Sequence, residues 1–264
     1  MMSNDIFHML ENDCQKLRLN LSAEEIASIA TEQDFNEAAL SAFKFLLDHV
    51  IEKKRRITVN TLLRLSRLPL RNAKTFNNFD FSAIHGKETE RLKNLETLSP
   101  LYAHKNVILV GPAGTGKTHL AQAFGYACCQ QGFKAYFIKM TELRDRMITA
   151  RSTGKTSRLM NSLVRPSCLI IDEVGHCQFD KENTQLFFDL VDRRYNKEGN
   201  FNMVFTSNKM PSEWNTNFGE SDSLLCALDR IFDQAIVFTL RGSSFRGQER
   251  EIIDLETRRI RSIK

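Results

Sequence analysis

The stretch GPAGTGKT, at residues 111–118, constrains the fold of this chain more than any other feature. It matches the pattern GxxxxGK(S/T) of a phosphate-binding loop, in which successive backbone N–H groups converge on the phosphates of a nucleotide. Such a loop follows a strand and opens a helix, whose positive end faces the anion. NVILV precedes the loop and HLAQAFGYA follows it, as a strand and a helix would. We therefore predict a nucleotide-binding α/β core.

Individual side chains of this loop have separate predicted roles. Lys117 would reach the β- and γ-phosphates, and the Thr118 hydroxyl would ligate magnesium. We therefore expect ATP and Mg²⁺ as cofactors, whereas His119 is interpreted as a core or capping residue without chemistry. The predicted nucleotide-binding residues are Gly111, Pro112, Ala113, Gly114, Thr115, Gly116, Lys117 and Thr118.

The sequence TGKT occurs a second time, at residues 153–156. There the first glycine of the pattern is replaced by Thr149, and the preceding TELRDRMITA has the character of an amphipathic helix. We predict that this copy does not bind nucleotide. Because residues 133–165 carry eight Lys/Arg against two Asp/Glu, the copy could equally contact nucleic acid or form an ordinary solvated loop.

Beyond residue 105, short apolar runs alternate with longer amphipathic stretches, which is typical of a parallel sheet with crossover helices. Before residue 75 the apolar spacing is helical, and Pro69 is predicted to end a basic helical stretch. The predicted fold class is α/β, a P-loop NTPase core with a parallel sheet and flanking helices, preceded by a small helical domain. The predicted domains are residues 1–75, with the basic stretch for DNA or a partner, and residues 76–264, with the ATPase.

Composition excludes several classes of protein. No apolar run approaches the roughly 18 residues of a membrane helix. The acidic N-terminus lacks the basic and apolar regions of a secretory signal, so we expect a cytoplasmic protein with no membrane partner. The six cysteines form neither a CxxC pair nor a zinc-like cluster, and buried free thiols are expected.

Polar residues follow two further predicted strands. Asp172 and Glu173 end the apolar run CLII, where one carboxylate can hold the hydration shell of magnesium and the next can polarise an attacking water. Asn208 ends FNMVFTSN and could orient that water, or simply cap the strand. Arg230 and Arg246 could stabilise the charge of phosphoryl transfer, although spacing does not say which arginine acts within its own subunit.

Five motifs together resemble the IstB-like ATPases, the transposition helper proteins of insertion sequences: GPAGTGKTHLAQAFG, CLIIDEVG, FTSN, SEWNTNFGESDSLLCALDRIFD and GSSFRGQE. That family belongs to the AAA+ group and is related to the helicase loaders of the DnaC type. The resemblance covers roughly residues 60–255 and implies an AAA+ core. It makes residues 111–118 the Walker A loop, Asp172 and Glu173 Walker B, and Asn208 sensor 1. The implied catalytic set is Lys117, Asp172, Glu173, Asn208, Arg230 and Arg246, with Thr118 and Asp172 as metal ligands.

The resemblance also implies an assembly. Arg230 would be an arginine finger offered to a neighbouring subunit and Arg246 the sensor 2 arginine, so hydrolysis would depend on a homo-oligomer built through its ATP-site interfaces. In the aromatic lead-in FNNFDF, Phe79 and Phe81 could pack near the adenine or simply anchor the core. The family commonly carries a Gly-Tyr pair after Walker B, whereas this chain has His176 there.

Two groups of basic residues are candidates for binding the DNA backbone with little sequence preference. Residues 1–52 hold three Lys/Arg against ten Asp/Glu, whereas residues 53–74 hold eight Lys/Arg and no acid. This basic stretch could lie on a duplex or pack on the acidic segment before it. The second group lies where the resemblance places the lining of a channel in a helical assembly. The candidates are Lys53, Lys54, Arg55, Arg56, Arg64, Arg67, Arg71 and Lys74, and then Arg144, Arg146, Arg151, Lys155 and Arg158.

The leading functional hypothesis follows from the resemblance. It is a DNA-dependent ATPase that assembles on double-stranded DNA with ATP and then recruits and stimulates a transposase. The alternative is a replicative helicase loader, which would bind single-stranded DNA and a helicase. A third hypothesis, a non-hydrolysing nucleotide switch, is disfavoured because such a switch needs none of Glu173, Asn208 and Arg230.

Overall fold

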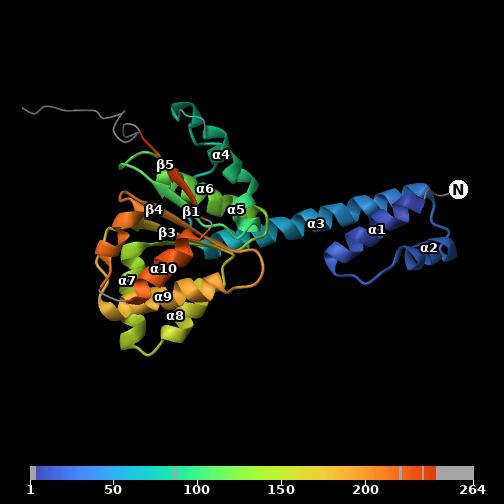
Figure 1. Ribbon diagram of the computed structural model, residues 1–264. Helices are drawn as coiled ribbons and strands as arrows, with labels where there is room; N and C mark the ends of the chain where they lie inside the picture. The colour runs from blue at the N-terminus through green and yellow to red at the C-terminus, as the bar shows by residue number, and fades with distance from the viewer. Residues whose placement is uncertain (1–3, 85, 87, 220–221, 234, 242–264) are drawn as a thin grey trace, which may run out of the picture.

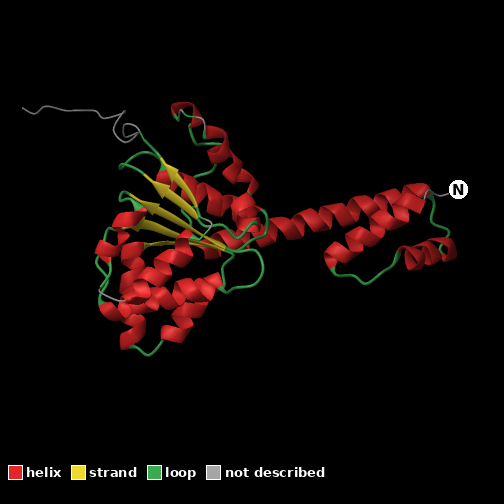
Figure 2. Ribbon diagram, in the orientation of Figure 1, coloured by secondary structure: helices red, strands yellow, loops and turns green. Residues whose placement is uncertain are grey.

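The computed structural model describes residues 4–84, 86, 88–219, 222–233 and 235–241 (Figures 1 and 2). A five-stranded sheet lies at its centre, in the order β2-β3-β4-β1-β5. All its strand pairs are parallel, so the carboxyl ends of the strands share one edge and the predicted α/β fold is confirmed. The strands are β1 (Val107–Val110), β2 (Ala135–Lys139), β3 (Cys168–Val174), β4 (Asn202–Ser207) and β5 (Ile236–Thr239).

Helices cover both faces of the sheet (Figure 2), because its strands are apolar on both sides. In β3, for example, Leu169 and Ile171 point into one apolar cluster, whereas Cys168 and Ile170 point into the other. The first cluster lies under α7 (Met140–Ser152), α8 (Thr156–Val164), α9 (Lys181–Tyr195), η3 (Pro211–Asn217) and α10 (Asp222–Phe232). The second lies under η1 (Phe81–Ala83), α4 (Thr89–Lys93), η2 (Asn94–Thr97), α5 (Ser99–Tyr102) and α6 (Lys117–Gln130).

The strand β5, which pairs with β1 at the edge of the sheet, is not among the strands predicted from the sequence. This strand has only four residues, which alternate between half-buried and exposed. Such a short segment carries little periodic signal, and its pairing with β1 depends on a distant part of the chain.

Three helices precede the sheet: α1 (Asn4–Leu17), α2 (Ala23–Glu32) and α3 (Glu37–Ser66). They enclose a small apolar cluster of their own, which includes Leu10, Leu40 and Leu47. Ser22 and Glu25 form a capping box at the start of α2, and Asn36 caps α3. This part of the chain therefore has the helical character that its apolar spacing predicts.

The helix α3 connects this helical unit to the sheet (Figure 1). It is one continuous helix of 30 residues, roughly 45 Å long. It ends at Ser66, before the predicted stop at Pro69, because Arg67 adopts a left-handed conformation with φ 63°. Val59 and Leu63 pack in the same cluster as α6. The end of α3 thus belongs to the core of the sheet although it precedes residue 75, and the division into two domains stays a prediction.

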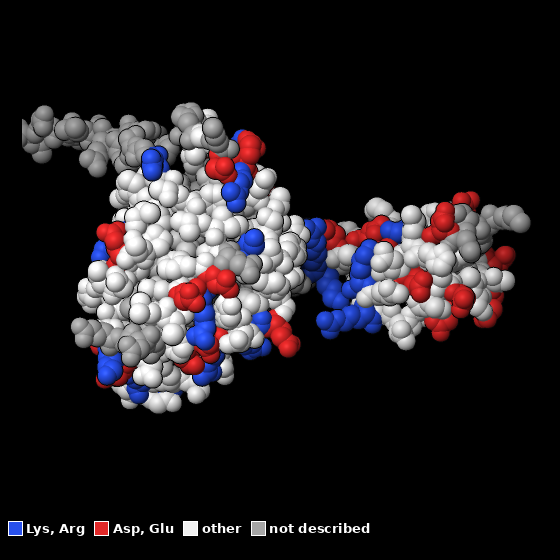
Figure 3. All heavy atoms as spheres, in the orientation of Figure 1, with Lys and Arg blue, Asp and Glu red and all other residues white. Residues whose placement is uncertain are grey.

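The charged surface changes sign along α3. Lys53, Lys54, Arg55 and Arg56, which we call the α3 basic cluster, are exposed between the helical unit and the sheet (Figure 3). Within the described residues, their one ion pair joins Arg55 to Glu52 at 3.9 Å. All four side chains are exposed, and Lys54 Nζ also donates to the carbonyl of Leu17 at the end of α1 (3.5 Å), so one member of the cluster contacts the helical unit.

Five of the six free cysteines are buried as predicted, but Cys226 is exposed on α10. That prediction is wrong at Cys226 because the side chain lies on the outer face of an amphipathic helix. Among the helices in the described ranges, none has the length and apolar character needed to cross a membrane.

A buried guanidinium connects α9 to the ends of neighbouring elements. Arg194 is fully buried, and burial lowers its pKa to about 10, so it stays protonated at neutral pH. Its partners are five carbonyl groups at the end of α8, in the segment between α8 and β3, and at the start of β4. They belong to Leu163, Val164, Pro166, Ser167 and Asn202, at 2.7 to 3.1 Å.

We predict that Arg194→Met lowers the free energy of unfolding by about 3 kcal/mol or more, because several buried carbonyls lose their donors. Arg193→Met is the matched control. Arg193 is an exposed neighbour paired with Asp189, and its replacement should cost about 0.5 kcal/mol or less. Urea denaturation measures both values, and equal losses would contradict the special role of Arg194.

Candidate nucleotide-binding site

The phosphate-binding loop connects β1 to α6 at the carboxyl edge of the sheet. Gly111 and Gly116 have φ values of 153° and 89°, a region that favours glycine. A Cβ on Gly111 would also lie 2.2 Å from the carbonyl oxygen of Leu240. Lys117 begins α6, and its Nζ donates to the carbonyls of Gly111 (2.7 Å) and Pro112 (2.6 Å). The loop therefore curls around its own lysine.

Phe79 packs against this loop from the segment that follows α3. A Cβ on Gly116 would lie only 2.7 Å from Phe79 Cε2. The Phe79 ring meets Phe81 and His119 edge to face, with centroid distances of 4.8 and 5.1 Å. Both phenylalanines also pack on the apolar cluster under α6. Core anchoring is thus visible for both rings, and contact with an adenine stays a prediction.

Asp172 joins three elements at the floor of the site. It is buried at the carboxyl edge of β3, and its Oδ1 accepts hydrogen bonds from the hydroxyls of Thr118 (2.9 Å) and Thr206 (2.5 Å). Burial raises the pKa of Asp172, although these two hydroxyls oppose the shift. Its Oδ2 is buried and has no hydrogen-bond partner among the described residues. An unsatisfied carboxylate oxygen beside a hydroxyl fits the oxygen ligands that Mg²⁺ prefers.

Glu173 leaves the sheet with an unusual backbone. Its φ is 62°, which is uncommon for a residue other than glycine and often marks a functional site. Its backbone N–H donates to Thr206 Oγ1 (3.0 Å), which stabilises this conformation. The carboxylate lines the cavity and forms an ion pair with Lys139 at the end of β2 (Nζ to Oε2, 3.0 Å).

A cavity of about 450 Å³ brings the predicted nucleotide site together. Its walls include the loop, Glu173, and Asn208 after β4, so residues far apart in the sequence meet at one edge of the sheet. Asn208 Nδ2 donates to His176 Nε2 at 3.2 Å. The lining residues are Lys74, Ala113, Gly114, Gly116, Lys117, Thr118, His119, Gln122, Glu173, His176, Thr206, Ser207 and Asn208.

Two further residues, Lys74 and His119, line the cavity, and only Lys74 is unexpected there. Lys74, which the sequence analysis groups with the DNA candidates, lies in the cavity wall beside His119. His119 Nε2 lies 3.0 Å from the Thr75 carbonyl oxygen and 2.9 Å from Asn78 Oδ1, so it caps the segment before the core as predicted. Burial lowers the pKa of His119, and the charge of Lys74 lowers it further.

Arg230 lies at the opposite edge of the sheet. The carbonyl of the next residue, Ile231, accepts a hydrogen bond from Asn106 (2.9 Å), which immediately precedes β1. The guanidinium pairs with Asp192 at 3.1 Å and lies 5.2 Å from the centroid of the Phe188 ring. Because the four residues of β1 span roughly 13 Å, Arg230 does not reach the cavity of its own chain. Arg246 lies outside the described residues.

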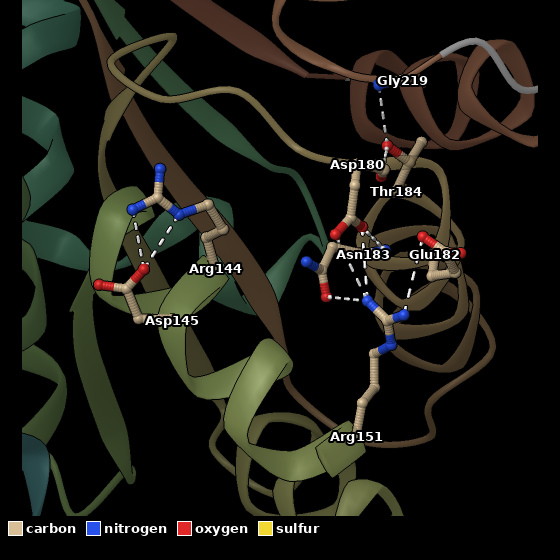
Figure 4. A network of polar contacts seen from close by, with 8 residues as sticks. All are labelled: Arg144, Asp145, Arg151, Asp180, Glu182, Asn183, Thr184 and Gly219. Carbon is tan, nitrogen blue, oxygen red and sulfur yellow. Dashed lines mark hydrogen bonds and ion pairs between the residues drawn. The ribbon is translucent and has the colours of Figure 1, made fainter.

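Most arginines of the second DNA group are engaged within the chain. Figure 4 shows Arg144 paired with its neighbour on α7, and Arg151 directed at the start of α9. Arg67 and Arg146 share one carboxylate. The pairs are Arg67–Glu142, Arg146–Glu142, Arg144–Asp145, Arg151–Asp180 and Arg151–Glu182.

Other candidates remain available for phosphates. Lys155 belongs to the second TGKT, which forms the turn between α7 and α8 and is preceded by a helix, as predicted. The following candidates have no ion pair within the part of the chain that the structure describes: Lys53, Lys54, Arg56, Arg64, Arg71, Lys74, Lys155 and Arg158.

Sequence reasoning missed two residues of the site. Thr206 bonds both Asp172 and the backbone of Glu173, and Lys139 pairs with the Glu173 carboxylate. Both lie at the carboxyl ends of strands that neighbour β3, and a polar residue at the end of a strand was the only signal in the sequence that could have indicated them. Neither residue type is distinctive without the strand order.

The fold and the site define a P-loop nucleotide-binding protein of the AAA+ group. The IstB-like ATP-binding protein family matches residues 12–252, and the chain belongs to this family. The ATP-binding protein of insertion sequence IS5376 from Geobacillus stearothermophilus is 34% identical over 90% of this chain and 94% of its own.

Solved structures share the fold. AMPPCP-bound DnaA from Aquifex aeolicus superposes with a TM-score of 0.53 at 21% identity, over 66% of this chain and 51% of its own. The DnaC helicase loader does so with a TM-score of 0.50 at 17% identity, over 63% of this chain and 98% of its own.

We predict that Gly116→Ala abolishes ATP binding, because the new methyl group collides with Phe79 and φ of 89° strains the loop. Gly132→Ala is the matched control, since its φ is 83° but nothing lies within 4 Å of the added carbon. Titration calorimetry with ATP measures binding, and thermal unfolding measures the cost of strain. Normal ATP binding by Gly116→Ala would contradict this account of the loop.

Proposed function

We propose that this chain hydrolyses ATP and assembles with ATP on double-stranded DNA, where it recruits and stimulates a transposase. The observation that carries the proposal is the separation of the catalytic groups. Glu173 and Asn208 line the nucleotide cavity at one edge of the sheet, and Arg230 lies at the other. Two copies stacked edge to edge would complete one site.

Within one copy, the cavity would bind and activate the reactants. Thr118 and Asp172 would hold Mg²⁺, which when bound neutralises phosphate charge. Lys117 would contact the β- and γ-phosphates. Glu173 would take a proton from the attacking water, and Asn208 would orient that water. The ion pair with Lys139 sets the direction in which the Glu173 carboxylate points.

Arg230 would act on the site of a neighbouring subunit. It is held by an ion pair to Asp192 and by the ring of Phe188, and its side chain is 30% exposed. A guanidinium presented on a surface in a fixed direction can stabilise the charge of a transferring phosphoryl group in another copy. Hydrolysis would then require assembly.

We predict that Arg230→Ala cuts ATP turnover about 1000-fold, within the range for arginine fingers, and leaves ATP binding nearly normal. Mixing this variant with Lys117→Ala, which cannot bind ATP, should restore part of the activity. In the mixture an intact cavity meets an intact Arg230 from the other variant. Steady-state turnover measures the effect, and a mixture as inactive as its components would argue against action in trans.

DNA binding is proposed for two exposed basic surfaces, the α3 basic cluster and the α7–α8 turn. Within the described residues, most of these cations have no ion pair and can replace the counterions of a duplex, and no pattern that reads bases accompanies them. The alternative, a helicase loader on single-stranded DNA, is favoured by one observation, the fold shared with DnaC. The membership in the insertion-sequence family favours the transposition role.

The experiment that tests the proposal uses Glu173→Gln, which should bind ATP but not hydrolyse it. We expect ATP, but not ADP, to drive a large assembly on a duplex and not on a single strand of equal length, as seen by analytical ultracentrifugation. Preference for the single strand would move the function to helicase loading. If the variant neither assembles nor binds DNA, both proposed functions are overturned.

In the same background, Lys53→Gln with Arg56→Gln should reduce the slope of log affinity against log salt by roughly 2, because about one counterion is released per phosphate contact. The control pair is Arg91→Gln with Lys93→Gln, whose cations are already paired with Glu88 and Glu90. An unchanged slope after the substitutions Lys53→Gln and Arg56→Gln would show that the α3 basic cluster does not contact DNA.

A further inference from the structure

The turn that follows Walker B is built to hold His176 in one place. Asn217 is buried, and its Nδ2 donates to the carbonyls of Gly175 (2.9 Å) and Cys177 (3.3 Å), on either side of His176. Lys209 Nζ donates to Asn217 Oδ1 (2.9 Å) and fixes that amide in turn. The backbone on both sides of His176 is therefore set by one buried side chain.

A second contact ties this turn to β4. Ser207, the last residue of β4, donates from Oγ to the carbonyl of Val174 (2.7 Å), the last residue of β3. Asn208 follows directly and faces His176 across the mouth of the cavity. Because both strand ends are joined, His176 and Asn208 are held opposite each other before any ligand arrives.

The hydrogen bond between these two side chains has a direction. The Asn208 amide nitrogen donates, and His176 Nε2 accepts. The Asn208 amide then keeps Oδ1, an acceptor, for a ligand in the cavity. A ring without an acceptor would leave the amide free to rotate and present either end.

We propose that His176 is a positioning residue, which turns the Asn208 amide so that Oδ1 accepts a hydrogen bond from the attacking water. This role rests on the proposed hydrolysis of ATP. His176 itself touches neither water nor phosphate in this scheme.

Two variants distinguish the contribution of the aromatic ring of His176 from that of its hydrogen-bond acceptor. His176→Phe keeps a ring and should lower kcat roughly three- to tenfold with an unchanged KM for ATP, as expected for the loss of one hydrogen bond. His176→Gln loses the ring but keeps an acceptor, and its kcat should stay close to that of the unaltered chain. Gln178→Ala, on the exposed continuation of the same turn, is the control and should change neither constant.

A double-mutant cycle then shows whether His176 acts through Asn208. Asn208→Ala and the double variant His176→Phe with Asn208→Ala should have the same kcat, because the histidine has nothing left to position. Additive losses, or a fully active His176→Phe, would overturn the role of His176 alone. An unaltered chain without any turnover would overturn the proposed hydrolysis as well. Thermal unfolding checks that each variant folds, and His176→Ala replaces His176→Phe should the latter not fold.

Discussion

The site depends on one buried carboxylate. Asp172 receives the hydroxyls of Thr118 and Thr206, so it joins the helix after β1, the end of β3 and the end of β4. Thr206 also accepts the backbone N–H of Glu173, which holds that residue in its strained conformation. A carboxylate buried this deeply is costly unless its oxygens are paired. Two hydroxyls satisfy one oxygen, and the other is left for a cation, so the groups that stabilise Asp172 also arrange the proposed metal site.

The parallel sheet separates the chemistry of one copy into two places. All five strands deliver their carboxyl ends to the edge that carries the loop, Glu173 and Asn208, whereas Arg230 lies in the last turn of α10, near the amino edge. A guanidinium at that edge has no nucleotide of its own to act on. In the proposed mechanism, a single copy is therefore incomplete and needs the Arg230 of a neighbouring copy. The proposed dependence of hydrolysis on assembly is thus a consequence of strand direction.

The basic side chains of this chain differ in how available they are to bind phosphates. Three helices enclose a separate apolar cluster, and the α3 basic cluster follows on the third of them. Its four side chains are exposed, although Lys54 also donates to the carbonyl of Leu17 at the end of α1. On α7, by contrast, arginines that were also candidates for DNA binding are paired with nearby carboxylates. These ion pairs make the arginines less available to bind phosphates, so Lys155 and Arg158 are the stronger candidates on that surface.

Local sequence patterns are sufficient to predict those parts of the protein that depend only on neighbouring residues. The loop at residues 111–118, the apolar strands and the carboxylates after β3 are recognisable because each motif needs only its own neighbours along the chain. The second TGKT could be set aside for the same reason, since a helix precedes it. Contacts between distant residues depend on the fold. Strand order brought Thr206 and Lys139 to the carboxylates, Lys74 to the cavity and His176 to Asn208, because strand ends far apart in sequence share one edge. No local pattern encodes that order, and so none of these contacts could be predicted from the sequence.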